Sequence, residues 1–196
     1  GRLRLLGQPI VPADGARDRL HYEVLSRLVD EDGREIPPAT FLPLIARMGM
    51  LQAFDRQVVA CTLERLGRDA ALLGCTATCA INLTGPTVAD PGFPAFLFER
   101  LAASGVAPGT IKLEITESDP ITSIEGAMRN TEVLVRGGLG FALDDFGTGL
   151  ATFDYLRRFA PDWVKIDGSF VRAVDDGPLG RQIVDSIVRV ARAAGA

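Results

Sequence analysis

The chain has 196 residues, of which 47% are hydrophobic and 23% charged, and its formal net charge is -4. This length and composition suit a single folded domain with its own hydrophobic core. The slightly acidic balance offers no basic field to a nucleic-acid polymer. No apolar run approaches the ~20 residues that a membrane-crossing helix requires. We therefore expect a domain that contacts neither nucleic-acid polymers nor a membrane.

Short apolar or alternating runs follow one another along the chain, separated by amphipathic stretches of helical length. The first seven residues are interpreted as a linker from an upstream domain, and the folded domain is expected over 8–196. Strands are predicted at 8–11, 20–28, 78–83, 110–116, 140–145 and 162–166, and helices at 38–48, 52–73, 92–104, 122–137, 149–158 and 178–194. Such repetition predicts a parallel sheet, either open and doubly wound or closed as a barrel.

Polar side chains toward the carboxyl ends of the predicted strands decide between these two folds. They come from five strands and comprise Glu23, Arg27, Asn82, Glu114, Asp144, Asp145 and Lys165. Polar groups gathered from many strand ends are typical of a barrel mouth. A doubly wound nucleotide fold would instead carry a glycine-rich loop after the first strand, whereas Val11–Gly15 contains one glycine. We therefore predict a TIM-like (β/α) barrel.

Alternation along the strands predicts which of these side chains point into the barrel. In Ile111–Thr116, Glu114 lies on the face opposite Leu113 and Ile115, so apolar contacts with the outer helices would turn it inward. Asn82 points inward by the same argument. Glu23 shares a face with Arg27, about 13 Å further along its strand.

The adjacent carboxylates Asp144 and Asp145 follow an apolar strand and precede Phe146-Gly147-Thr148-Gly149. Either they cap the next helix, or a cation lies between them. Inward oxygen ligands on neighbouring strands favour the cation, and oxygen ligands without histidine or thiolate suit Mg²⁺ or Mn²⁺. The predicted two-metal site comprises Glu23, Asn82, Glu114, Asp144 and Asp145.

Two basic residues stand beside this predicted site. Lys165 alternates inward and could orient or help deprotonate an attacking water, or could simply form an ion pair with Asp144 or Asp145. Arg27 has the fork geometry for a phosphate oxygen, although an ordinary surface arginine is the alternative.

These residues stand within a series of motifs that resembles the EAL domain family, in the family's order from residue 8 onward. The motifs are Gln8-Pro9-Ile10-Val11, Glu23-Val24-Leu25-Ser26-Arg27, Phe41-Leu42-Pro43, Ile81-Asn82-Leu83-Thr84, Leu113-Glu114-Ile115-Thr116-Glu117, Asp144-Asp145-Phe146-Gly147-Thr148-Gly149 and Lys165-Ile166-Asp167. The resemblance implies a modified TIM barrel with an antiparallel first strand. It also implies hydrolysis of cyclic diguanylate (c-di-GMP) to linear pGpG with Mg²⁺ or Mn²⁺.

The resemblance also assigns roles to individual residues. Glu23, Asn82, Glu114, Asp144 and Asp145 match the metal ligands, with Glu23 and Asp144 among the catalytic residues. Lys165 matches the lysine that holds the catalytic water; Gln8, Arg27 and Asp167 match substrate contacts, and Glu117 matches the acid that braces the loop. A homodimer and an upstream regulatory or GGDEF-type domain are also implied. The expected location is cytoplasmic, either as a cytoplasmic protein or as the cytoplasmic part of a larger, membrane-attached one.

Departures from the family pattern leave open what the chain does. Val24 replaces the alanine of the signature triplet, which keeps the glutamate ligand, and Ala46 stands where a glutamate is usual. The last two barrel strands of the family are expected beyond Ala196, so we expect an incomplete EAL domain. The alternatives are an inactive EAL domain that acts as a c-di-GMP receptor, and a barrel enzyme that abstracts a proton beside a carboxylate. The aspartate pair and Asn82 argue against the latter.

Overall fold

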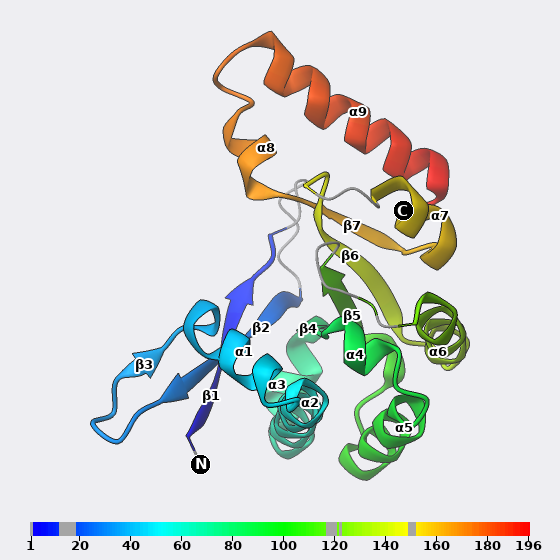
Figure 1. The fold of residues 1–196 in the computed structure, drawn as a ribbon. Coiled ribbons are helices and arrows are strands. Elements are labelled where there is room, and N and C mark those ends of the chain that lie inside the picture. The colour runs from blue at the N-terminus through cyan, green and yellow to red at the C-terminus, as the bar shows by residue number, and fades with distance from the viewer. Residues whose placement is uncertain (1, 12–18, 117–120, 122, 149–151) are drawn as a thin grey trace.

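The computed structural model describes residues 2–11, 19–116, 121, 123–148 and 152–196. A curved seven-stranded sheet forms the centre of the molecule (Figure 1). Its strands in spatial order are β1 (Leu3–Pro9), β2 (Leu20–Val29), β4 (Thr76–Asn82), β5 (Ile111–Thr116), β6 (Gly140–Phe146) and β7 (Trp163–Ile166), with β3 (Glu35–Ile36) paired to β2. β1 runs antiparallel to β2, and the strands from β2 to β7 along the order are parallel.

Helices connect the parallel strands and lie on the outer face of the sheet, where Figure 1 shows α2, α5, α6 and α9. Their bounds are α1 (Pro38–Arg47), α2 (Leu51–Arg68), α3 (Ala70–Cys75), α4 (Gly85–Val88), α5 (Phe93–Ser104), α6 (Ile124–Arg136), α7 (Thr152–Phe159), α8 (Gly168–Arg172) and α9 (Pro178–Ala194), with a 3₁₀ turn at Pro108–Thr110. This alternation confirms the predicted TIM-like α/β fold with an antiparallel first strand.

The observed elements differ from the predicted ones in several places. Leu3–Gly7, interpreted as linker, belong to β1 and pair with β2, so that interpretation is wrong for these residues. The single helix predicted over 52–73 is two helices, because Asp69 leaves the helical conformation and caps α3 by accepting a hydrogen bond from the Leu72 backbone at 3.0 Å. The short β3, α4 and α8 and the 3₁₀ turn were not predicted, and the strand predicted over 8–11 ends at Pro9.

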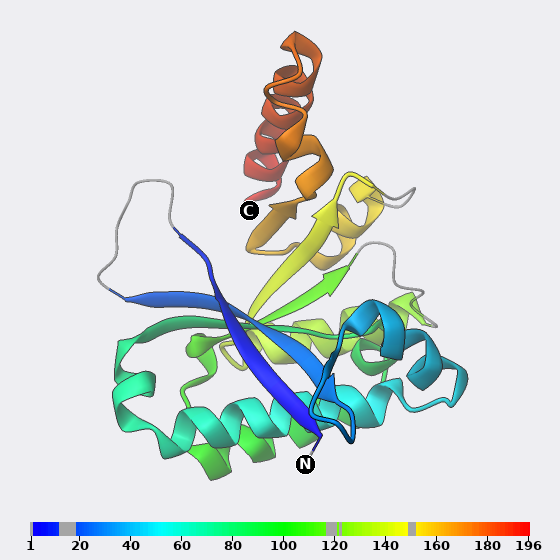
Figure 2. The same ribbon diagram turned by 90° about the vertical axis from the view of Figure 1, so that its left-hand side faces the viewer.

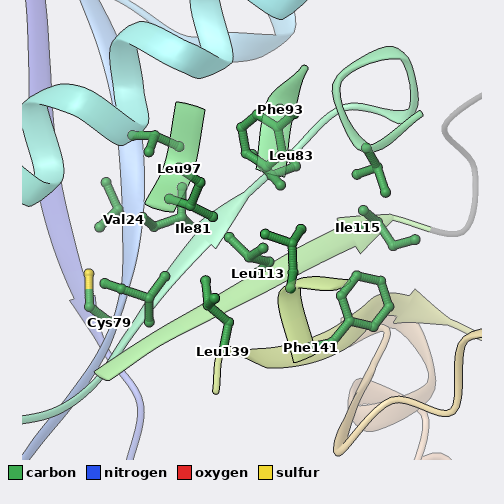
Figure 3. Close-up of a cluster of buried hydrophobic side chains, with 14 of the residues drawn as sticks. Val24, Cys79, Ile81, Leu83, Phe93, Leu97, Leu113, Ile115, Leu139 and Phe141 are labelled. Atoms are coloured by element: carbon green, nitrogen blue, oxygen red, sulfur yellow. The ribbon is translucent and has the colours of Figure 1, made fainter. Parts of the chain in front are cut away.

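The hydrophobic core lies between the outer face of the sheet and the helices. Figure 3 shows Ile81, Leu113 and Ile115 from neighbouring strands pointing toward the same apolar cluster as Phe93 and Leu97 of α5. Because side chains alternate along a strand, residues that fill this core turn their neighbours toward the barrel interior. The packing of the core therefore orients the polar interior.

A layer of polar and aromatic residues fills the barrel interior near the amino-terminal ends of the strands. Lys112, 5% exposed, forms an ion pair with Asp162, and its Nζ lies 3.8 Å from the centroid of the Trp163 ring. Asp162 also accepts a hydrogen bond from the Phe141 backbone at 2.7 Å. His21 Nδ1 lies 3.1 Å from Thr78 Oγ1. These contacts join neighbouring strands beneath the ends that carry the acidic residues.

Two edges bound the sheet, and Figure 2 shows β1 at one of them and β7 at the other. Within the described ranges, each of these two strands pairs on one side only. Of the three free cysteines, Cys79 is buried, Cys75 is exposed and Cys61 is partly exposed. None of the described helices combines the length and the apolar character needed to cross a membrane.

Two helical glycines make a matched test of the packing between α2 and α5. A Cβ on Gly67 would lie 2.4 Å from the Ser104 carbonyl oxygen, whereas a Cβ on Gly74 would meet nothing within 4 Å. Gly67→Ala should lower the free energy of unfolding by about 1–3 kcal/mol, since backbone must move. Gly74→Ala should be neutral or raise it by up to ~1 kcal/mol through helix propensity. Urea denaturation measures both, and equal effects would contradict the close α2–α5 contact.

Candidate functional site

Five polar side chains from five neighbouring strands converge at one end of the barrel. They are Glu23 of β2, Asn82 of β4, Glu114 of β5, Asp144 of β6 and Lys165 of β7. The strand register accounts for this, because Asn82 lies opposite Glu114, and Thr116, two residues after Glu114, lies opposite Asp144. The predicted convergence of these strand ends is confirmed.

Lys165 is the centre of the cluster. Its Nζ donates hydrogen bonds to Glu23 Oε2 at 2.8 Å, to Glu114 Oε2 at 2.8 Å and to Asp144 Oδ2 at 2.9 Å. The ion pair with Asp144 that the sequence left as an alternative is therefore present, together with two further carboxylates. Burial by itself would lower the pKa of Lys165, but the hydrogen bonds and charges of these carboxylates outweigh it and raise that pKa. Lys165 is thus a protonated ammonium at neutral pH.

Glu114 is the most deeply buried member, with 0% of its surface exposed. Its Oε1 receives no hydrogen bond from any of the described residues. Burial raises the pKa of Glu114 to about 7, against the opposing effect of Lys165 and with a further rise from the charges of Glu23 and Asp144. A buried carboxylate oxygen without a donor is costly unless a cation or another donor reaches it.

Asn82 joins the cluster through Glu23. Its Nδ2 donates to Glu23 Oε1 at 2.6 Å, so the amide oxygen remains available to a ligand. The next backbone N–H, that of Leu83, donates to the Glu114 carbonyl oxygen at 2.8 Å. These bonds fix the end of β4 between β2 and β5.

Asp145 follows Asp144 on β6 with an unusual backbone conformation. Its φ is +52°, and the pairing of β6 with β7 shifts register between Leu143 and Phe146. Aspartate tolerates this left-handed region better than most residues, at a cost on the order of 1 kcal/mol. Burial, and then the charges of Asp144 and Asp167, raise the pKa of Asp145. The turn therefore holds a second carboxylate close to the first.

The charges of the cluster do not balance. Three carboxylates contact one ammonium, so with all groups ionised two negative charges remain uncompensated. One oxygen from each of Glu23, Glu114 and Asp144 lies within 4.8 Å of the others. Oxygen donors at this spacing, together with the donor-free oxygen of Glu114, fit a hard divalent cation. The residues present thus suit the metal that the sequence predicted.

The other predicted site residues lie around this cluster or outside the described part. Gln8 is exposed and lies opposite Glu23 in the β1–β2 register, and Arg27 donates to the Ser26 carbonyl at 2.8 Å. Asp167 caps α8 by accepting from the Ser169 backbone at 2.8 Å, and hydrogen bonds from Ser169 lower its pKa. Glu117 lies outside the described residues. The structure thus brings Gln8 onto the face of Glu23, but gives Arg27 no contact with the acidic cluster.

A cavity that the sequence did not indicate adjoins the cluster. It has a volume of about 550 Å³ and lies between α1, α2 and the ends of β2 and β4. Asn82 and Thr84 line it on the side of the cluster, and Leu42, Pro43 and Ala46 line it from α1. Leu42 and Pro43 belong to a motif of the family resemblance, but these apolar residues gave no indication of a cavity.

A family model described as the EAL domain matches residues 1–196. The chain belongs to the EAL domain family. It is 34% identical over 188 residues to the cyclic di-GMP phosphodiesterase PdeF of Escherichia coli K12, covering 96% of this chain and 25% of PdeF. It is 35% identical over 196 residues to the probable cyclic di-GMP phosphodiesterase PdeA of the same organism, covering 98% and 26%. The chain thus spans about a quarter of the length of these relatives.

Solved EAL domains share the fold. The FimX EAL domain from Pseudomonas aeruginosa bound to c-di-GMP superimposes with a TM-score of 0.87 at 27% identity, covering 99% of this chain and 77% of that one. Klebsiella pneumoniae BlrP1 in a calcium and c-di-GMP complex gives a TM-score of 0.82 at 27% identity, covering 100% and 48%. The predicted family is confirmed.

Removing the central ammonium should destabilise the protein in the absence of divalent cations. In Lys165→Met, three carboxylates lose their shared counter-charge. Losing one partner of a buried pair costs ~3–5 kcal/mol; because Lys165 is 27% exposed, we expect about 2 kcal/mol. Thermal unfolding with and without Ca²⁺ measures the effect, and Ca²⁺ should restore part of the loss. The exposed pair Arg2–Glu31 supplies the control, since Arg2→Met should change stability by less than ~1 kcal/mol.

Glu114 should make the metal-free protein less stable as pH rises. Its pKa in the folded state, about 7, exceeds the 4.5 of a solvent-exposed glutamate. The folded state therefore binds more protons than the unfolded state within this window, so the free energy of unfolding falls as pH rises from about 4.5 to 7. Glu114→Gln should flatten this fall, as measured by urea denaturation in a chelating buffer. An unchanged slope would contradict the burial effect on Glu114.

Proposed function

We propose that this chain is a phosphodiesterase domain that hydrolyses c-di-GMP to linear pGpG with Mg²⁺ or Mn²⁺. The observation that carries the proposal is the convergence of Glu23, Glu114 and Asp144 on a single lysine, beside Asn82. Relatives that match 96% and 98% of this chain bear the names of cyclic di-GMP phosphodiesterases, and two structural neighbours contain c-di-GMP.

The proposed metal ligands are Glu23, Asn82, Glu114, Asp144 and Asp145. When bound, two divalent cations would neutralise charge on the phosphodiester and lower the pKa of a water molecule. The carboxylates supply the negative charge that concentrates the cations, and the Asn82 amide supplies a neutral oxygen. Carboxylate and amide oxygens without thiolate or imidazole favour Mg²⁺ or Mn²⁺ over zinc.

Lys165 is proposed to orient the attacking water. In the metal-free protein the carboxylates raise its pKa, so it is protonated near neutral pH and can act as a hydrogen-bond donor. Its three N–H groups now point to three carboxylates. If those carboxylates also held cations, Lys165 could donate one N–H to the oxygen of the attacking water. That hydrogen bond would orient the water so that a free lone pair of its oxygen faces the phosphorus atom. In this way the lysine helps to position the attacking water.

The surrounding residues are proposed to bind the cyclic dinucleotide. Gln8 lies opposite Glu23 and is exposed, so its amide can reach a ligand above the cluster. Arg27 is a phosphate contact, and Asp167, at the end of β7, is a second polar contact. The loop-bracing role of Glu117 also stays a prediction, as do the homodimer, the upstream regulatory or GGDEF-type domain and the cytoplasmic location.

Hydrolysis can be tested by incubating the protein with c-di-GMP and Mg²⁺ or Mn²⁺ and separating the products by chromatography. We expect pGpG as the product. Glu23→Gln and Asp144→Asn should each reduce the rate by more than the ~10–100-fold typical of losing an outer-shell group, since both are proposed ligands. Glu99→Gln, which removes an exposed carboxylate paired with Arg100, should leave the rate unchanged.

Two results would contradict the proposal in different ways. Tight c-di-GMP binding in Ca²⁺ without product in Mg²⁺ or Mn²⁺ would indicate a receptor rather than an enzyme. Full activity in Glu23→Gln would place the metal site elsewhere.

A further inference from the structure

We propose that Asp55 is a positioning residue, which holds the segment after β4 and thereby fixes Asn82 beside Glu23. This inference rests on the proposed function, in which Asn82 is a metal ligand. Asp55 comes from α2 rather than from a strand, and none of the strand-end motifs includes it.

Asp55 is a buried carboxylate, 3% exposed, whose Oδ2 accepts several hydrogen bonds from one short segment. The Thr84 backbone N–H donates at 2.8 Å, the Thr84 hydroxyl at 2.7 Å and the Thr87 hydroxyl at 2.6 Å. Hydrogen bonds to an ionised acceptor are roughly twice as strong as neutral ones. Three of them on one buried oxygen tie the start of α4 firmly to α2.

The tied segment begins directly after Asn82. The Leu83 N–H is bonded to the Glu114 carbonyl of β5, and the following N–H, that of Thr84, is bonded to Asp55 of α2. Consecutive N–H groups are thus held by two different elements. The backbone at Asn82 has little freedom to rotate, and its amide stays 2.6 Å from Glu23. Outer-shell bonds of this kind orient metal ligands.

A simpler explanation is that Asp55 only caps α4. Thr84 precedes this four-residue helix and makes no capping bond with its own side chain, so Asp55 serves as an acceptor there. A cap would stabilise the protein without affecting Asn82. The placement favours the wider role, because Asp55, Asn82 and Thr84 line the same cavity of about 550 Å³ beside the acidic cluster.

The experiment compares Asp55→Ala, Asn82→Ala and the double variant by Mn²⁺ titration, with unbound Mn²⁺ measured by electron paramagnetic resonance. Asp55→Ala should weaken Mn²⁺ binding by about 10–100-fold, the usual cost of losing an outer-shell group. The double variant should bind no more weakly than Asn82→Ala alone, because the two residues act through one contact. Additive losses would overturn the inference.

Asp69→Ala is the matched control. Asp69 also caps a helix with its carboxylate, but it lies fourteen residues beyond Asp55 along α2, about 20 Å away. It should lower the stability by less than Asp55→Ala does, because Asp69 is 35% exposed and accepts a single backbone hydrogen bond, and it should keep the wild-type Mn²⁺ affinity. If both variants weaken Mn²⁺ binding equally, general destabilisation explains the effect and the positioning role is wrong.

A readout that needs no metal separates this inference from the proposed function. In a ¹⁵N-labelled protein, the side-chain amide of Asn82 should exchange its protons slowly in the wild type and at least tenfold faster in Asp55→Ala. If Asp55→Ala does not fold, Asp55→Asn replaces it, since it keeps the shape and removes the charge. Slow exchange in the folded Asp55 variant overturns the inference even where pGpG forms. Fast exchange supports it even where the wild type yields no pGpG.

Discussion

The excess of negative charge around Lys165 is the constraint on which the site depends. Three carboxylates from β2, β5 and β6 meet one ammonium from β7, and one of them is fully buried. Selection for stability alone would replace such a cluster with apolar residues, because desolvating unbalanced charge costs more than the ion pairs return. The pKa of Glu114, raised to about 7, expresses that cost. The excess negative charge is compensated only when further positive charge, such as a divalent cation, binds to the cluster.

The barrel interior contains a second lysine with the opposite balance. Lys112 points into the same interior nearer the amino-terminal ends, where it pairs with Asp162 and lies over the Trp163 ring. There one carboxylate meets one ammonium, and an aromatic face covers the cation. The lower layer is therefore neutral and holds β5, β6 and β7 together. At the carboxyl ends of the strands, by contrast, the single ammonium of Lys165 contacts three carboxylates. The same residue type thus has a structural role in one layer and, by our proposal, a functional role in the next.

Much of the fold and site could be predicted from the sequence because period-two alternation is a local property. Leu113 and Ile115 belong to the core, which fixes Glu114 on the opposite face. The same local logic missed the first part of β1, residues 3–7, although alternation of arginine and leucine continues back to Arg2. Only Leu3 and Leu5 of this segment pack against the core, which is a weak apolar signal, and its pairing with β2 is what identifies the strand. Similarly, the helical pattern runs past Asp69, where a cap breaks the helix.

The sequence predicted that the strand ends meet, but it did not identify the individual contacts between residues far apart in the chain. The bond between Lys165 and Glu23 joins positions 142 residues apart, and the sequence offered only a pairing with the neighbouring aspartates. The sequence did not predict a role for Asp55 either, because a single acidic residue in an amphipathic helix is normally exposed to solvent. Its partners, Thr84 and Thr87, follow shortly after Asn82, the end of β4, which lies within one of the sequence motifs. The strand ends thus supply the chemical groups, and the helices behind them determine how firmly each group is held.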